Sequence, residues 1–274
     1  MKSRPLLAAA FLACLLVLAG ALVGYGQPRP DAGAKEDAGP GPKKTRFIDL
    51  GGGVKMEFVS IPPGSFLMGS EKGRPDERPV TKVTITKAFH LGKYEVTQEQ
   101  WQAVMGNNPS FYKGANLPVE QVNWNDCQSF VAKLKDKVSG GEFSLPTEAQ
   151  WEYACRAGTS TEYSFGDGDA NLGEYAWFTG NSNRQTHPVG EKKANPWGLY
   201  DIHGNVWEWC QDWYGPYASA EVSDPTGASS GSSRVIRGGS WSHSSRDLWS
   251  SFRLKFAPDF RFRSIGVRVV LVER

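Results

Sequence analysis

The segment between Gly158 and Val235 constrains the fold of this chain more than any other feature. Residues 159–234 are rich in Gly, Asn, Ser, Asp and Trp and contain few apolar runs, which predicts little regular secondary structure. A loop region this long inside a compact domain is usually functional, or is held by ions or disulfides. The 274 residues include 31 Gly, 17 Pro and 10 Trp. This composition favours a loop-rich domain with a core of large rings.

Short segments with strand-like patterns lie on both sides of this region. Residues 56–61 and 80–89 alternate between apolar and polar side chains, and each predicts a β-strand. Residues 235–236 and 265–272 are rich in Val and Ile and predict further strands near the C-terminus. Small antiparallel sheets are therefore expected at both ends of the folded region.

Three helices are expected between these strands. Thr97, Asn125 and Thr147 each stand three residues before a Gln. This is the capping-box pattern, in which a side chain at the helix start and another three residues later satisfy each other's backbone N–H groups. Short helices, small sheets and much irregular chain together predict an α+β fold.

The N-terminus predicts export. Lys2 and Arg4 precede the apolar run 6–23, so residues 1–26 are interpreted as a signal peptide or an N-terminal anchor. Residues 27–45 contain Pro, Gly, Ala and charges, and are expected to form a disordered linker before a folded domain at 46–274. The protein would then be periplasmic, secreted, or anchored by residues 6–23, with membrane contact only through this segment.

The charge balance argues against a nucleic-acid partner. Lys and Arg number 31 and Asp and Glu number 29, which gives a formal net charge of +2. Such a chain lacks the basic stripe that binds phosphates. The four histidines do not have metal-ligand spacing.

Three cysteines follow the N-terminal segment: Cys127, Cys155 and Cys210. An odd number in an exported chain allows at most one intramolecular disulfide. Cys127 and Cys155 lie on expected helices, which favours buried, unpaired side chains.

Seven segments, in this order, resemble one family. The resemblance covers residues 58–270 and indicates the sulfatase-modifying factor domain, which is the fold of the formylglycine-generating enzyme. It implies a single domain, distantly similar to C-type lectins, that often holds calcium. The segments are IPPGSFLMGS (61–70), YEVTQEQW (94–101), PVEQVNWNDC (118–127), LPTEAQWEYACRAG (145–158), NPWGLYDIHGNVWEWCQDW (195–213), VIRGGSW (235–241) and IGVRVV (265–270).

The resemblance also implies what the chain lacks. Active members of the family oxidise a substrate cysteine with two thiolates that bind copper(I), at the third and eighth places after the Ser of a Gly-Gly-Ser-aromatic run. Here that run ends at Ser240-Trp241, and the two places hold His243 and Leu248. Copper(I) prefers sulfur ligands, and no Cys occurs after Cys210. We therefore do not expect copper or the oxidase reaction.

The family's calcium sites carry over in part, so a structural calcium ion is expected. Asn replaces an acidic ligand in the first site, which would weaken it. The residues that match the first site are Asn171, Leu172, Asn181 and Asn183, and those that match the second are Asn205, Val206, Glu208 and Cys210.

A non-catalytic binding or accessory module is the favoured function, with a protein, peptide or glycan as partner. The alternatives are a formylglycine-generating oxidase and a lectin-like ligand-display protein. The expected ligand-binding residues are Ser240, Trp241, Ser242, His243, Arg246 and Arg253, a mixture of rings and polar groups typical of recognition surfaces. In a purely structural alternative, Trp241 and Arg253 are buried and hold the last strands together.

Overall fold

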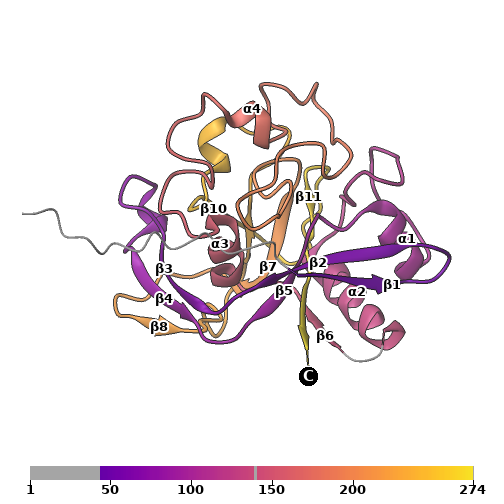
Figure 1. Ribbon diagram of the computed structural model, residues 1–274, viewed down its shortest axis with the longest axis horizontal. Helices are drawn as coiled ribbons and strands as arrows, with labels where there is room; N and C mark the ends of the chain where they lie inside the picture. The colour runs from indigo at the N-terminus through magenta and orange to yellow at the C-terminus, as the bar shows by residue number, and fades with distance from the viewer. Residues whose placement is uncertain (1–43, 139–140, 274) are drawn as a thin grey trace, which may run out of the picture. The chain divides into compact units, whose positions relative to one another are not determined.

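The computed structural model describes residues 44–138 and 141–273 (Figure 1). The expected signal peptide or anchor and nearly all of the linker lie outside these residues. Among the described helices, none has the length and apolar character needed to cross a membrane.

Three sheets form the framework. The five-stranded sheet is antiparallel throughout, with the order β1 (Thr45–Asp49), β2 (Lys55–Ile61), β5 (Phe89–Gly92), β12 (Val270–Glu273) and β6 (Gly141–Ser144). The four-stranded sheet has the order β10 (Arg253–Phe256), β9 (Arg234–Arg237), β7 (Trp207–Trp213) and β11 (Ile265–Gly266), and β11 is parallel to β7. The three-stranded sheet has the order β3 (Gly64–Met68), β4 (Thr81–Ile85) and β8 (Val222–Ser223), and β8 is parallel to β4.

Helices α1 (Gln98–Met105) and α2 (Trp124–Lys137) pack against each other, and α2 contacts β6 (Figure 1). Helix α3 (Glu148–Arg156) contacts β3, β7 and β9, while the short α4 (Leu172–Tyr175) lies among loops. Two single-turn 3-10 helices, η1 (Pro75–Glu77) and η2 (Ser245–Leu248), complete the regular elements of the described residues.

The capping boxes at Thr97 and Thr147 are confirmed, since each side chain accepts the backbone N–H of the Gln three residues later. The start of α2 was placed wrongly: its N-cap is Asn123, not Asn125. The reason is that Asp126 completes the box, with its carboxylate accepting the N–H of Asn123 at 2.9 Å. A carboxylate at this position can accept the backbone N–H of the N-cap residue, as the side chain of Gln does.

Two expected strands are each divided. Segment 80–89 forms β4 and β5, which pair in different sheets, and segment 265–272 forms β11 and the start of β12. The interruptions let one apolar segment contribute to two sheets. The irregular character of 159–234 is confirmed except for α4, β8 and β7, and β7 is the central strand that the sequence did not reveal.

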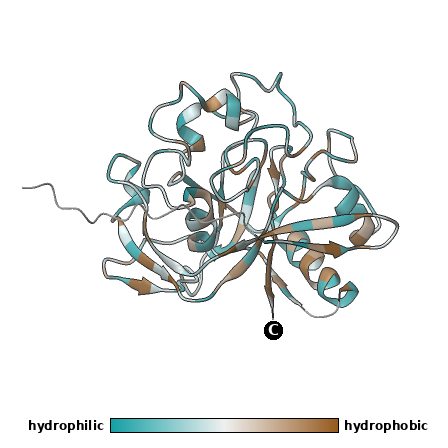
Figure 2. Cartoon of the chain, in the orientation of Figure 1, coloured by the Kyte–Doolittle hydropathy of each residue, from teal (hydrophilic) through white to brown (hydrophobic). Residues whose placement is uncertain are grey.

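The core is aromatic, as the Trp content predicts. The rings of Trp101 and Phe130 stack at 4.9 Å between α1 and α2, and Trp207 and Trp209 of β7 belong to the same buried cluster. Figure 2 shows apolar residues on the strands and along α2, while the loops near α4 are mostly hydrophilic. Strand β7 therefore links the aromatic core to the irregular half of the domain.

Candidate functional site

Strand β7 presents a buried carboxylate to a single guanidinium. Arg268 donates to Glu208 through Nε at 3.0 Å and through a terminal nitrogen at 2.7 Å. The indole of Trp151 donates to Oε2 of Glu208 at 2.6 Å, and this oxygen also accepts from Nε of Arg268. Both ionic side chains are essentially unexposed. This geometry fixes the orientation of Glu208 from two sides, by α3 and by the segment between β11 and β12.

Two further carboxylates lie near Arg268. The carboxylate of Glu95 accepts the backbone N–H of Val206 and the side-chain amide of Asn205, and Asp201 accepts the N–H of Gly190. The other Asp201 oxygen, Oδ1, is buried without a hydrogen-bond partner among the described residues. We call Glu95, Asp201, Glu208 and Arg268 the Arg268 cluster.

The Arg268 cluster contains more negative than positive charge. Burial raises the pKa of Glu95 well above its usual range and that of Asp201 to about 6, and the neighbouring carboxylates add to both shifts. Burying an unpaired carboxylate charge costs free energy. The raised pKa values therefore indicate that Arg268 compensates only part of the negative charge.

The second predicted calcium set is only partly brought together. Asn205 and Glu208 lie in or beside the Arg268 cluster, but their side-chain oxygens already accept hydrogen bonds from His187, Arg268 and Trp151. Cys210 packs elsewhere, in an apolar cluster with Trp151, Cys155, Ile202 and Val235. The backbone supports this arrangement: Asn205 has φ 54°, and a Cβ at Gly204 would collide with the carbonyl of Trp177.

The first predicted calcium set surrounds α4. Asn171 precedes the helix and is exposed, while Leu172 is buried. The amide of Asn181 accepts the N–H of Phe178 and donates to the carbonyl of Ala176, so it bridges the turn after the helix. Asn183 is exposed. Over residues 44–138 and 141–273, no group of three or more His, Cys, Asp and Glu side chains has a metal-binding arrangement.

The two positions that correspond to the copper-binding thiolates have different surroundings. The Nδ1 atom of His243 receives the indole N–H of Trp207 at 3.2 Å and lies 2.6 Å from the hydroxyl oxygen of Ser240. Leu248 is fully buried, and a Cβ at Gly239, which has φ 77°, would collide with its side chain. Neither position offers a soft sulfur ligand.

The remaining cysteines do not supply a substitute. Cys127, Cys155 and Cys210 are buried and free. Burial raises the pKa of the Cys155 thiol to about 12 and the pKa values of the other two well above their usual range. All three are therefore protonated at neutral pH, whereas nucleophilic or metal-binding chemistry needs the thiolate.

The six predicted ligand-binding residues divide into a buried and an exposed group. Trp241 is 4% exposed, and its indole donates to the carbonyl of Arg263. Arg253 is 2% exposed and binds both oxygens of Glu148. Both side chains are therefore buried, as in the alternative in which they hold the last strands together. Ser240 is also buried, His243 is half-buried, and Ser242 and Arg246 are exposed.

Sequence reasoning missed the aromatic surface next to Trp241. The guanidinium of Arg263 lies 5.5 Å from the Trp241 ring centre and 5.8 Å from that of Phe111. Phe111 is 59% exposed and Phe262 is 44% exposed, and Phe260 stacks on Phe256 at 4.3 Å. We call Phe111, Phe260, Phe262 and Arg263 the aromatic surface. Its signal is the alternation of Phe and Arg in FRFR (260–263).

A second group of buried charges surrounds α3. Glu148 pairs with Arg253, while Glu152 pairs with Arg156 at 2.8 Å and with Arg237. Arg237 also lies 3.7 Å from Glu148. We call these five residues the α3 cluster. The α3 cluster connects α3 to β9 and β10. Its carboxylate charges are far better compensated by guanidiniums than those of the Arg268 cluster.

Comparison with known proteins identifies the family. Residues 53–272 match the family described as the sulfatase-modifying factor enzyme 1-like domain. The chain therefore belongs to this family. Because the expected Gly-Gly-Ser-Trp run is present without the cysteine pair, it is a divergent member.

The relatives have diverse names. The chain is 33% identical over 266 residues to chaperone protein LppX of Paenibacillus barcinonensis, covering 79% of this chain and 90% of LppX. It is 36% identical over 155 residues to the formylglycine-generating enzyme of Streptomyces coelicolor, covering 52% and 47% of the two chains. It is 31% identical to serine/threonine-protein kinase pkn1 of Chlamydia caviae, covering 77% of this chain but 37% of the kinase.

Solved structures support the same fold. Treponema denticola variable protein 1 superposes with a TM-score of 0.77 at 32% identity, covering 82% of this chain and 98% of that protein. The α+β class and the sulfatase-modifying factor fold are therefore confirmed.

Proposed function

We propose that this protein is an exported, non-catalytic family member that acts as a binding or accessory module. The observation that carries the proposal is the loss of both copper ligands, at His243 and at the buried Leu248. The N-terminal segment 1–26 supports export. The name of LppX, a chaperone protein, is compatible with a family member that binds other proteins.

The aromatic surface is the proposed contact region, with a peptide or protein as partner. Exposed aromatic rings beside an Arg are the composition of interface hot spots. The guanidinium of Arg263 lies 5.5 Å from the ring centre of Trp241 and 5.8 Å from that of Phe111, so it stands beside both rings. The exposed Ser242 and Arg246 would contribute to the polar rim.

A reaction assay separates this proposal from the oxidase alternative. The domain is incubated with a cysteine-containing sulfatase-type peptide, copper(I) and a reductant, next to a formylglycine-generating enzyme as positive control. We expect no aldehyde product by mass spectrometry. The variant with both His243→Cys and Leu248→Cys should gain copper(I) binding, because it restores two sulfur ligands. Turnover by the unaltered domain would refute the proposal.

A binding assay tests the surface. Peptides selected from a random library are expected to bind the unaltered domain and to lose at least about ten-fold in affinity on Phe111→Ser with Phe262→Ser, about 1.4 kcal/mol. The matched control is Phe47→Ser, which alters an exposed ring on β1. Equal losses in the control would contradict the assignment. Binding of glycans but not of peptides would favour the lectin-like alternative.

We also propose a structural calcium ion at Asp201, on the side of its unpartnered oxygen. The supporting observations are the unpartnered Oδ1 of Asp201 and the excess of carboxylates over guanidinium in the Arg268 cluster. Oxygen donors of this type suit a hard cation such as calcium. Asn205 would act indirectly, by holding Glu95 in place.

A further inference from the structure

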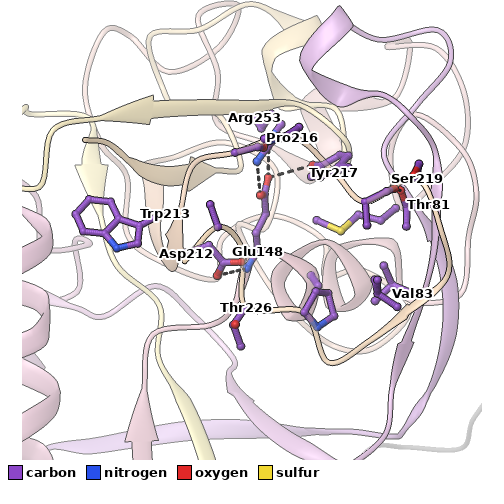
Figure 3. Close-up of a pocket in the computed structure, with 18 of the residues that line it drawn as sticks. Thr81, Val83, Glu148, Asp212, Trp213, Pro216, Tyr217, Ser219, Thr226 and Arg253 are labelled. Carbon is purple, nitrogen blue, oxygen red and sulfur yellow. Dashed lines mark hydrogen bonds and ion pairs between the residues drawn. The ribbon is translucent and has the colours of Figure 1, made fainter. Parts of the chain in front are cut away.

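A pocket of about 670 Å³ lies between α3, the end of β7 and the three-stranded sheet (Figure 3). None of the residues of the aromatic surface lines it. Apolar side chains form much of its wall, among them Met68, Val83, Ala149 and Val222. The pocket is large enough for a small organic group or a few amino-acid side chains.

The polar floor of the pocket is centred on Glu148, whose charge is already matched. Arg253 donates to its two oxygens at 2.8 and 2.5 Å, and the hydroxyl of Tyr217 donates at 3.1 Å (Figure 3). The remaining terminal nitrogen of Arg253 donates to the carbonyls of Asp76 and Gly215. The buried donors on this side of the pocket are therefore used within the protein.

Asp212 is different, because its charge has no direct partner. The side chain is 3% exposed, and Oδ2 accepts the backbone N–H of Glu148 at 2.9 Å. The two guanidiniums that act on this carboxylate, those of Arg253 and Arg234, form no ion pair with it. Arg253 is committed to Glu148, and Arg234 is held between the rings of Trp124 and Trp213.

We propose that this pocket binds a primary ammonium group on an aliphatic stem, of the kind that a lysine side chain carries. The carboxylate of Asp212 accepts but cannot donate, so the polar group of a ligand must be a donor. A cation also compensates the charge, and the apolar wall accommodates the stem. An anion would be repelled by Asp212 and would find the buried donors already occupied.

The pH of the measurement follows from the surroundings of Asp212. Burial and the neighbouring Glu148 raise the pKa of Asp212 to about 7, against the opposing effects of Arg253 and Arg234. Binding is therefore measured at pH 8, where the carboxylate is mostly ionised and an alkylammonium remains charged.

The test uses three probes of equal length: hexylamine, hexanol and hexanoate. Titration calorimetry gives the affinities, and backbone amide shifts around 148, 212 and 222 locate the binding. We expect hexylamine to bind at least ten-fold more tightly than hexanol, and hexanoate to bind more weakly than both. Equal affinity of hexylamine and hexanol would overturn the proposal.

Variants make the assignment specific. Asp212→Asn keeps the shape and an acceptor for the Glu148 N–H, and it should reduce hexylamine affinity to that of hexanol. The matched control, Asp136→Asn on the exposed side of α2, should change neither affinity. Ser219→Trp, at an exposed position of the pocket lining, should weaken both probes without altering the carboxylate. A preference for hexylamine that survives Asp212→Asn, or binding unaffected by Ser219→Trp, would refute the site.

Discussion

The two buried groups of charges differ in how their carboxylates are compensated. In the α3 cluster, two carboxylates face three guanidiniums, and both Glu148 and Glu152 form ion pairs. In the Arg268 cluster, three carboxylates share one guanidinium, and only Glu208 contacts it directly. Glu95 and Asp201 rely on neutral N–H donors instead.

This difference separates a structural role from a binding role. A buried ion-pair network that satisfies its own charges can hold elements together without help, as the α3 cluster does for α3, β9 and β10. A buried group with surplus negative charge is stable only if protons or an external cation compensate it. Stability is therefore expected to depend more strongly on solution conditions through the Arg268 cluster than through the α3 cluster.

The largest expected effect is that of Arg268→Met. Among the described residues, Arg268 carries the only guanidinium in contact with Glu208, so its removal leaves three carboxylates close together without a partner cation. Breaking a buried pair typically costs about 3–5 kcal/mol. We expect a loss of at least this size in the free energy of unfolding, measured by urea denaturation.

Arg156→Met is the matched comparison in the α3 cluster. Glu152 retains Arg237 and the backbone N–H of Gly69 after this change. We expect a smaller loss, about 1.5–3 kcal/mol, typical of a hydrogen bond to a charged group. An equal or greater loss for Arg156→Met would mean that the carboxylates of the α3 cluster are no better compensated than those of the Arg268 cluster.

The next prediction concerns the effect of calcium on the stability of the domain. A ligand that binds only the folded state stabilises it by about 2.7 kcal/mol at 100 times its dissociation constant. We expect the melting temperature to rise with calcium relative to a chelator, and the rise to disappear in Asp201→Asn but not in Asp136→Asn. Melting that does not respond to calcium, together with no calcium in metal analysis of the purified domain, would contradict the site.

The sequence predicted those elements whose characteristic residues lie close together along the chain. The boxes at Thr97 and Thr147 were recognisable because both partners lie within one helical turn. The family segments located the Gly-Gly-Ser-Trp run and therefore the missing thiolates. The α+β class followed from the same short patterns.

The features that the sequence did not reveal depend on contacts between distant residues. Strand β7 has polar and aromatic residues where a strand pattern would have Val or Ile, and its Glu208 is tolerated only because Arg268, 60 residues later, neutralises it. Likewise, Trp241 and Arg253 could be read as exposed or buried until their partners Arg263 and Glu148 were known. Charge pairing between distant segments has no local pattern.

The smallest effect concerns Glu120, a buried carboxylate outside both clusters. One oxygen accepts the N–H of Tyr112, and the other has no partner among the described residues. Burial raises the pKa of Glu120 from its ordinary 4.5 to about 7. The folded state therefore binds the proton more tightly than the unfolded state does, and stability should fall as the pH rises from about 4.5 to about 7 and stay level above it.

Glu120→Gln should flatten this part of the stability profile, because the amide keeps an acceptor for Tyr112 and cannot ionise. The measurement is urea unfolding at half-unit pH steps from 4 to 8, in a buffer with chelator so that calcium does not contribute. Asp136→Asn, which removes an exposed carboxylate, should leave the profile unchanged. If Glu120→Gln retains the full decrease between pH 4.5 and 7, the decrease belongs to the other buried carboxylates whose pKa is raised, namely Glu95, Asp201 and Asp212.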